Sequence, residues 1–280
     1  MINTPKHLAY TLKVNMKEIY SIIQNIDNFY KERVIQKEND DGTPKLDGKG
    51  RQKFRILNPS YRRLKVIQKR IQRNILLKLQ LPDYAYGAVK GRDNVDNAEA
   101  HKGKKYHFTT DLRNFFPSIN HTRVFKMFRT YGFSPEVSRL LTQLTTYKGR
   151  LPQGSPTSST IANLVFVKTG KNLDTFARKH QLTFTSFVDD LTFSSAIDFK
   201  EKSSEIIEMI TQDGFKISHN KTNYSRKPLV TGIHPTNNYL KLPESFMKKL
   251  AGIELFKDDQ KKGLLLYKKK VDKKNKKVFN

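Results

Sequence analysis

The 280-residue sequence predicts an α+β fold, because two different periodicities alternate along it. Apolar residues recur every three or four positions in the segments 12–29 and 61–81, which is the spacing of amphipathic helices. Short runs of alternating polar and apolar residues at 107–111 and 182–194 are typical of strands. With 36% hydrophobic residues, the chain can bury a core divided over two or three subdomains.

The composition indicates a nucleic-acid partner. The formal net charge is +27, from 53 Lys and Arg against 26 Asp and Glu, and such a field attracts phosphate backbones. A generic basic binding protein would explain the charge equally well. The absence of cysteine excludes disulfides, thiolate catalysis and cysteine zinc sites. The start lacks the apolar core of a secretory signal, and no run is long enough to span a bilayer, so we expect a cytoplasmic protein without a membrane partner.

The first predicted strands follow the helix over 12–29. Strand candidates at 32–36 and 52–57 flank the polar loop 39–50, which predicts a hairpin with an extended tip. Arg51, Lys53 and Arg55 are spaced by two and therefore share one face. Lys53 and Arg55 are candidates to contact a triphosphate or a nucleic-acid backbone. A charged edge strand that resists aggregation is the alternative.

The predicted strands at 182–186 and 191–194 form a hairpin with two adjacent carboxylates at its tip, in the sequence Phe187-Val188-Asp189-Asp190. A cation would relieve this concentration of negative charge, whereas an isolated Asp pair could also be an ordinary turn. Asp111 ends the strand at 107–111. If that strand lies beside the hairpin, three carboxylates converge, as a two-metal phosphoryl-transfer site requires.

A loop rich in Pro and Gly, Leu151-Pro152-Gln153-Gly154-Ser155-Pro156-Thr157-Ser158, precedes a predicted helix. Gly154 allows a nucleotide to approach the backbone closely, and Ser155 or Ser158 can cap the helix. Gln153 and Gly154 are candidates to position a base pair and a template. A plain turn before a helix is the alternative.

Three of these segments together resemble polymerase motifs of the reverse transcriptases. Asp111 with Phe115-Phe116-Pro117-Ser118 resembles motif A, the loop 151–158 motif B, and Phe187-Val188-Asp189-Asp190 motif C, in the same order and with similar spacing. The resemblance implies a right-hand polymerase architecture with fingers, a palm whose antiparallel sheet carries the carboxylates, and a short thumb. The implied domains are 1–100 for the N-terminal helix and fingers, 101–232 for the palm with motifs A to D and some interleaved fingers elements, and 233–280 for the thumb and a basic tail.

The same resemblance implies the metal chemistry. Asp111, Leu112, Asp189 and Asp190 would hold two Mg²⁺ ions, with Mn²⁺ as a substitute, and Leu112 would also contact the nucleotide. Phe187 departs from the family pattern, because it replaces the usual tyrosine of motif C. The ring is kept and the hydroxyl is lost, so we expect altered base-pair contacts with metal binding preserved.

Two further roles come from the resemblance. Phe116 occupies the position of the aromatic residue that blocks a ribose 2′-OH and so selects deoxynucleotides. Lys221, in the segment 214–222 that resembles motif D, would protonate the pyrophosphate leaving group. Phe116 could instead be a core aromatic, as we expect for Phe115, and Lys221 could be a solvated lysine.

Two short signatures resemble those of bacterial retron reverse transcriptases. The segment 84–93 is followed by Asn97-Ala98-Glu99-Ala100-His101, similar to their N-A-x-x-H, and Val230-Thr231-Gly232 is similar to their V-T-G. The resemblance implies RNA binding by the residues Asn97, His101, Val230, Thr231 and Gly232. The lysine tract over 268–277 would add contacts with RNA phosphates, or would form a soluble tail.

The sequence therefore predicts an RNA-directed DNA polymerase that consumes deoxynucleoside triphosphates. Retron resemblance implies a dedicated structured non-coding RNA as template and primer, and an RNA-linked single-stranded DNA product (msDNA). It also implies anti-phage defence with a separate effector protein in a higher-order complex. The alternatives are another bacterial defence or group II-like reverse transcriptase, and a scaffold that binds RNA and DNA and holds an effector inactive.

Overall fold

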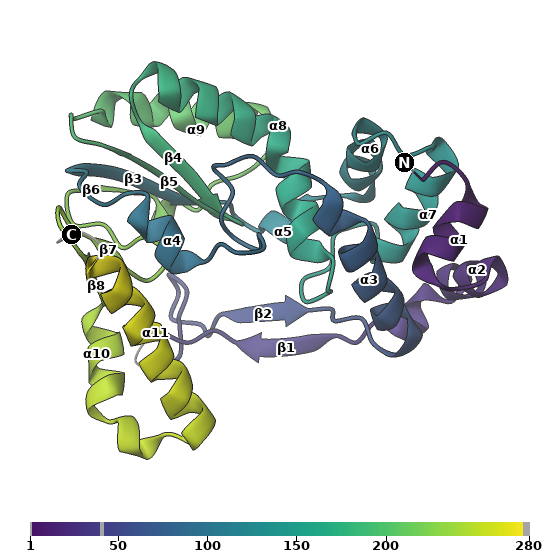
Figure 1. Ribbon diagram of the computed structural model, residues 1–280, viewed down its shortest axis with the longest axis horizontal. Coiled ribbons are helices and arrows are strands. Elements are labelled where there is room, and N and C mark those ends of the chain that lie inside the picture. Colours follow the sequence, from purple (N-terminus) through teal and green to yellow (C-terminus); the bar gives the residue numbers. More distant parts are fainter. Residues whose placement is uncertain (1, 40–41, 277–280) are drawn as a thin grey trace. The chain divides into compact units, whose positions relative to one another are not determined.

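The computed structural model describes residues 2–39 and 42–276. The chain forms two compact units, each assembled from two separate segments. Unit 1 comprises Met1–Leu81 and Asn114–Val167, and unit 2 comprises Pro82–Arg113 and Lys168–Asn280. Figure 1 labels the α-helices and β-strands of both units. The division into fingers, palm and thumb at residues 100 and 232 stays a prediction.

Unit 1 is mainly helical. Its helices are α1 (Pro5–Leu12), α2 (Met16–Gln24), η1 (Ile26–Phe29), α3 (Arg62–Asn74), η2 (Leu76–Lys78), α5 (Phe115–Ser118), α6 (His121–Thr130), α7 (Pro135–Thr145) and the first part of α8 (Ser158–Lys179). The apolar spacing that predicted a helix over 61–81 is realised in α3, whose Leu64, Ile67 and Ile71 are fully buried. The predicted helix ends early, because the α-helical backbone stops at Asn74 and only a short 3₁₀ turn follows.

The prediction of a single helix over 12–29 is wrong, because the helical backbone is interrupted between Leu12 and Met16. α1 ends at Leu12, and Lys13 adopts a left-handed conformation with φ of 52°. α2 begins after Asn15, whose side chain accepts a hydrogen bond from the backbone N–H of Glu18 at 2.7 Å. Asparagine is a strong N-cap, so it starts a new helix. Apolar periodicity hides this break because the helices on both sides bury apolar faces.

The predicted hairpin of unit 1 is confirmed. β1 (Arg33–Gln36) pairs with β2 (Phe54–Leu57) in antiparallel register, with Val34 opposite Ile56. Isolated bridges between Leu46 and Gln52 and between Glu38 and Pro44 extend the ribbon into its tip. Alternation therefore places Arg55 on the face opposite to Phe54 and Ile56.

Unit 2 contains a four-stranded antiparallel sheet in the order β4-β5-β3-β6. The strands are β3 (Tyr106–Asp111), β4 (Thr183–Phe187), β5 (Asp190–Ser195) and β6 (Asn223–Ser225). One face is aromatic: Phe193 stacks on Phe184 at 4.6 Å between ring centroids and lies 6.2 Å from Phe108. The other face carries His107, Thr109 and Asp111, because these residues alternate with the aromatic positions.

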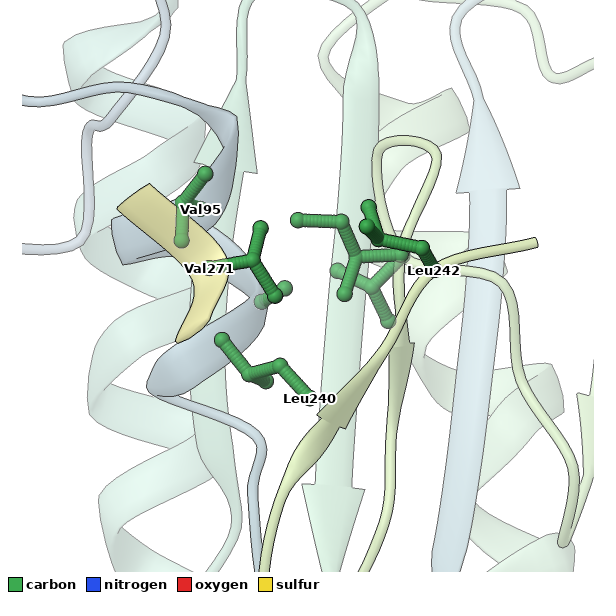
Figure 2. Close-up of a cluster of buried hydrophobic side chains, with 7 residues drawn as sticks. Val95, Leu240, Leu242 and Val271 are labelled. Carbon is green, nitrogen blue, oxygen red and sulfur yellow. The ribbon is translucent and has the colours of Figure 1, made fainter. Parts of the chain in front are cut away.

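Unit 2 contains further helices and two short strands. They are α4 (Asn94–Glu99), the second part of α8, η3 (Lys200–Lys202), α9 (Ser203–Gln212), η4 (His219–Lys221), β7 (His234–Pro235), β8 (Leu240–Lys241), α10 (Glu244–Ala251), η5 (Ile253–Leu255) and α11 (Asp258–Lys276). A second apolar cluster joins α4, the 230–242 segment and α11, and Figure 2 shows Val271 of α11 beside Val95 of α4. Across residues 2–39 and 42–276, none of the helices combines the length and apolar character needed to cross a bilayer.

Candidate active site

The predicted acidic hairpin is present, and its turn is very tight. Phe187 pairs with Asp190, so only Val188 and Asp189 form the turn. Val188 has φ of 61°, a left-handed conformation that is unusual for a β-branched residue. Gly87 packs against this turn, where an added Cβ would lie 2.7 Å from the Val188 nitrogen and 2.8 Å from the Phe187 carbonyl carbon. Only glycine fits that contact without displacing the turn.

The segment before Gly87 holds the hairpin from the side of β4. The Tyr86 N–H donates to the Ser186 carbonyl, and the Ser186 N–H donates to the Tyr84 carbonyl, both at 2.8 Å. The Tyr84 ring lies 5.1 Å from the Phe184 ring and fills the space that the missing side chain of Gly170 leaves in α8. Sequence reasoning singled out the segment 84–93 but missed this supporting role of Gly87.

The structure brings Asp111 to the same hairpin. Asp111 on β3 lies directly opposite Asp190 on β5, and the Leu112 N–H donates to the Asp189 carbonyl at 2.8 Å. The antiparallel register therefore gathers three acidic residues at one end of the sheet. The Leu112 side chain is buried, so only its backbone carbonyl could contact a metal ion or a nucleotide.

Lys221 supplies a positive charge to this cluster. Its Nζ donates to Oδ2 of Asp111 at 2.5 Å, and the Ser218 hydroxyl donates to Oδ1 of Asp111 at 2.8 Å. Desolvation lowers the pKa of Lys221, but the hydrogen bond and charge of Asp111, followed by the charges of Asp190 and Asp189, raise it overall. The ammonium group therefore stays protonated and acts as the counter-charge of Asp111. Ser218 is a further contact that sequence reasoning missed, although it lies within the segment 214–222.

The three carboxylates repel one another. Desolvation, followed by the negative charges of Asp189 and Asp111, raises the pKa of Asp190 to about 6, although Lys221 opposes the shift. In residues 2–39 and 42–276, no three or more His, Asp or Glu side chains are arranged to hold an ion as they stand. The donor set nevertheless fits Mg²⁺, because close carboxylate oxygens are the ligands of hard cations and a bound cation would relieve their mutual repulsion.

The motif B loop lies in unit 1, where the end of the β1–β2 ribbon holds it. The Gln153 carbonyl accepts a hydrogen bond from the Asn58 N–H at 2.8 Å. Gly154 has φ of 101°, and its position lies close to Pro59 and the Leu57 side chain. The Ser158 hydroxyl donates to the Pro152 carbonyl at 2.6 Å, so Ser158 fastens the loop and does not cap α8 as expected.

The other predicted nucleotide contacts also belong to unit 1. Arg55 is exposed and Lys53 is half-buried on the ribbon. Phe115 is buried and meets Phe166 edge to face, which confirms it as a core residue, whereas Phe116 is half-buried. The roles of Lys53, Arg55 and Phe116 toward a nucleotide stay predictions.

The five residues predicted to bind RNA divide by exposure. Asn97, His101 and Val230 are buried among protein groups, Thr231 is half-buried and Gly232 is exposed. Contact with RNA stays a prediction for all five, and for the three buried side chains it requires an opening of the structure.

The lysine tract forms part of α11, and two of its members bind acidic residues around α4. Lys270 forms an ion pair with Asp93, and Lys274 contacts Asp96 at 2.8 Å and Glu99 at 2.5 Å. Lys277 lies outside the described residues. The tract is therefore neither a free tail nor wholly available to RNA.

Comparison with known proteins places these features in a family. Residues 35–251 match the family model described as "Reverse transcriptase (RNA-dependent DNA polymerase)". The chain is 33% identical to the retron Se72 reverse transcriptase of Salmonella heidelberg (strain 579083-10), over 81% of this chain and 60% of that protein. It is 29% identical to the retron Ec86 reverse transcriptase of Escherichia coli, over 79% of this chain and 67% of that protein. The chain thus spans about two thirds or less of these relatives.

A solved structure supports the fold alone. The telomerase of Candida albicans, in complex with a TWJ fragment of telomeric RNA, superposes with a TM-score of 0.51 at 11% identity, over 85% of this chain and 54% of that one. The α+β reverse transcriptase fold predicted from the motifs is confirmed. The chain belongs to the reverse transcriptase family and is similar to its bacterial retron members.

Proposed function

We propose that this protein is an RNA-directed DNA polymerase that joins deoxynucleotides by metal-assisted phosphoryl transfer. The observation that carries the proposal is the register of the unit 2 sheet, which sets Asp111 opposite Asp190 with Asp189 in the adjoining turn. Like-charged carboxylates are gathered in this way where a cation is to be bound. The names of its relatives, all reverse transcriptases, support the same activity.

In this function, Asp111, Asp189 and Asp190 would hold Mg²⁺ through their carboxylates, and Leu112 would contribute its carbonyl. Two ions are expected, and Mn²⁺ is expected to replace them. Divalent ions bound here would supply charge stabilisation for the attacking and the leaving oxygen. The tight turn at Val188 fixes the position of Asp189.

The remaining residues act on the nucleotide. Lys53 and Arg55 bind its triphosphate, Gln153 and Gly154 position the base pair and template, and Phe116 excludes a ribose 2′-OH. The primer 3′-hydroxyl gives its proton to solvent water, and the bond from its oxygen to the α-phosphorus forms as the bond to the bridging oxygen of pyrophosphate breaks. Lys221 gives its proton to that leaving group. Lys221 must first exchange its contact with Asp111 for a contact with the triphosphate.

We further propose a retron role. The substrate RNA is a structured non-coding RNA that serves as template and primer, and the product is an RNA-linked single-stranded DNA. Similarity to several retron reverse transcriptases supports this assignment. Anti-phage defence with a separate effector protein, in a higher-order complex in the cytoplasm, is the biological setting that we propose.

The test is Mg²⁺-dependent deoxynucleotide incorporation on RNA that co-purifies with the protein. The wild type is compared with Asp189→Ala/Asp190→Ala and with Asp258→Ala/Asp259→Ala, an exposed acidic pair at the start of α11 that carries the same charge change. We expect a discrete RNA-linked DNA that only the first variant fails to make. Bound RNA without incorporation by the wild type would favour the scaffold, and unlinked DNA would favour another reverse transcriptase class.

A further inference from the structure

His101 bridges the two strands of the acidic hairpin. Its fully buried imidazole lies 2.6 Å from the Ser194 hydroxyl on β5 and 2.8 Å from the Thr185 hydroxyl on β4. Burial lowers the pKa of His101 to about 3, with smaller contributions from the charges of His107 and Lys104. The neutral ring therefore donates to one hydroxyl and accepts from the other.

These contacts lie on the same face of the sheet as the carboxylates. Thr185 pairs with Thr192, and Ser194 lies two residues beyond Thr192 on β5. Because alternate residues share a face, Ser194 and Thr192 point to the same side as Asp190. One imidazole thus fixes the strands on both sides of the turn that carries Asp189.

α4 also binds the V-T-G segment. The Asn94 amide donates to the Thr231 carbonyl at 3.0 Å, and the Thr231 hydroxyl donates to the Asn94 carbonyl at 3.1 Å. The Asn97 amide reaches the same hydroxyl at 3.2 Å. Thr231 has φ of 46°, so these bonds hold a left-handed conformation that a threonine rarely adopts.

α11 also packs against α4. Asp93 caps α4 by accepting from the Val95 and Asp96 N–H groups, and Lys270 pairs with Asp93. Lys274 binds Asp96 and Glu99 one and two turns further along. Val271 lies between these lysines and packs in the apolar cluster with Val95 (Figure 2). Charge pairs and apolar contacts therefore join α11 to α4 along its length.

We infer that the segment 93–101 is an internal connector that positions the Asp189–Asp190 hairpin and ties it to α11. His101 is a positioning residue, and Asn97 and Thr231 of the two signatures bind each other within the protein. The inference deepens the proposed function, since it assumes that the hairpin performs the chemistry. It differs from an RNA contact in a testable way: loss of His101 slows synthesis on every primer and leaves RNA affinity unchanged.

The main test compares His101→Leu with His107→Leu. His107 is also buried on this face of the sheet, but its Nδ1 has no hydrogen-bond partner and its Nε2 only reaches the His101 carbonyl at 3.3 Å. On a generic RNA template with a DNA primer, we expect His101→Leu to lower kcat about 10- to 100-fold, as small displacements of reacting groups do. We expect RNA affinity and the KM for nucleotides to stay within about threefold, and His107→Leu to lower kcat less than about threefold.

A double-mutant cycle tests the bridge itself. Thr185→Val removes the hydroxyl and keeps the shape of the side chain. If the imidazole acts through Thr185, adding Thr185→Val to His101→Leu lowers kcat by no more than about twofold further, whereas independent residues would give multiplied effects. Multiplied effects would overturn the bridge. Lys274→Met, which removes the contacts with Asp96 and Glu99, should lower kcat in the same direction by a smaller factor.

Hydrogen exchange separates failure of the connector from failure of the proposed polymerase. Amides of the 187–190 turn should exchange about tenfold faster in His101→Leu than in the wild type or in His107→Leu, whether or not the protein incorporates nucleotides. Circular dichroism verifies that each variant is folded. Unchanged exchange at the turn, together with weakened RNA binding, would overturn the connector and assign His101 to RNA. A wild type without synthesis but with the expected exchange pattern would reject only the polymerase.

Discussion

The two ends of the unit 2 sheet treat polar groups in opposite ways. At one end, Asp111, Asp189 and Asp190 bring like charges together, and the pKa of Asp190 rises to about 6 through desolvation and these neighbours. Toward the other end, the buried His101 is neutral and satisfied by two hydroxyls. Like charges gathered in a desolvated site are costly and persist where function requires them, whereas hydrogen-bonded buried groups fix a structure.

The two ends therefore contain two kinds of signature motif. Both kinds stand out in the sequence, but the carboxylate end gathers like charges that a cation would neutralise. The end near α4 differs, because the side chains of Asn97, His101 and Asp96 bind other protein groups there. We therefore propose that the carboxylate end reacts and that the end near α4 holds it in place.

Substitution of an aspartate at the carboxylate end should change the rate of synthesis most. Asp111→Asn keeps the size of the side chain but removes its charge, so we expect incorporation to fall about 10³-fold with RNA affinity retained. Ser218→Ala removes only one hydrogen bond to Asp111, and the rate should fall less than about tenfold. Initial rates of primer extension measure both variants. Near-normal synthesis by Asp111→Asn would remove this residue from the metal site.

A second prediction concerns the turn between the two strands. Gly87→Ala places a Cβ within 2.8 Å of the Phe187 and Val188 backbone. We expect a loss of about 1–3 kcal/mol in the free energy of unfolding, together with slower synthesis, because the crowded turn must move. Denaturant titration measures the loss. Gly263→Ala in α11 is the control: nothing lies within 4 Å of its Cβ, so helix propensity should make it slightly stabilising.

The buried histidines near α4 should make the stability of the protein sensitive to acid. Burial lowers the pKa of His101 from 6.5 to about 3 and also lowers that of His107. Below about pH 6.5 these histidines bind protons in the unfolded chain but stay neutral in the native protein. The free energy of unfolding is therefore greatest above that pH and decreases below it. Each histidine should cost up to about 1.4 kcal/mol per pH unit.

Denaturant unfolding of the wild type and His101→Leu, at about pH 7.5 and 5.0, measures this slope. The variant should be less stable at the higher pH and should lose less stability on acidification. Equal slopes for the two proteins would mean that the native state admits a proton at His101.

The smallest expected change is a shift in Tm caused by substitution of Asp190. A raised carboxyl pKa means that the native protein binds a proton more tightly than the unfolded chain, so the stability that protonated Asp190 contributes below pH 3.8 is lost as the pH rises to about 6. In metal-free buffer, Asp190→Asn should therefore raise the Tm at neutral pH and change it little at acidic pH, while synthesis is lost. A lower Tm at neutral pH would show that Asp190 supports the fold.

Much of this arrangement could be predicted from sequence, because it depends on local patterns. Alternation around Phe187-Val188-Asp189-Asp190 predicted the hairpin, and Asp111 at a strand end predicted the convergence that the β3–β5 register produces. The reverse transcriptase motifs then predicted the fold. The interruption at Lys13 and Asn15 was missed, because it depends on a cap and a single left-handed residue.

The inward role of the signature segments could not be predicted from sequence. Asn97 and His101 are polar residues that would suit an RNA surface equally well, and only their partners distant in sequence, among them Thr231 and Ser194, place them inside. The same holds for Gly87, whose importance depends on the Val188 backbone. Long-range contacts of this kind leave no periodic signal.

A titration with Mn²⁺, in which electron paramagnetic resonance reports the free ion, tests directly whether the three aspartates bind a metal. The wild type, Asp111→Asn/Asp189→Asn and Asp258→Asn/Asp259→Asn are compared at neutral pH. We predict that the wild type and Asp258→Asn/Asp259→Asn bind Mn²⁺ with the same affinity. Asp111→Asn/Asp189→Asn should lose this binding. Equal binding by all three proteins would contradict a metal site at Asp111, Asp189 and Asp190.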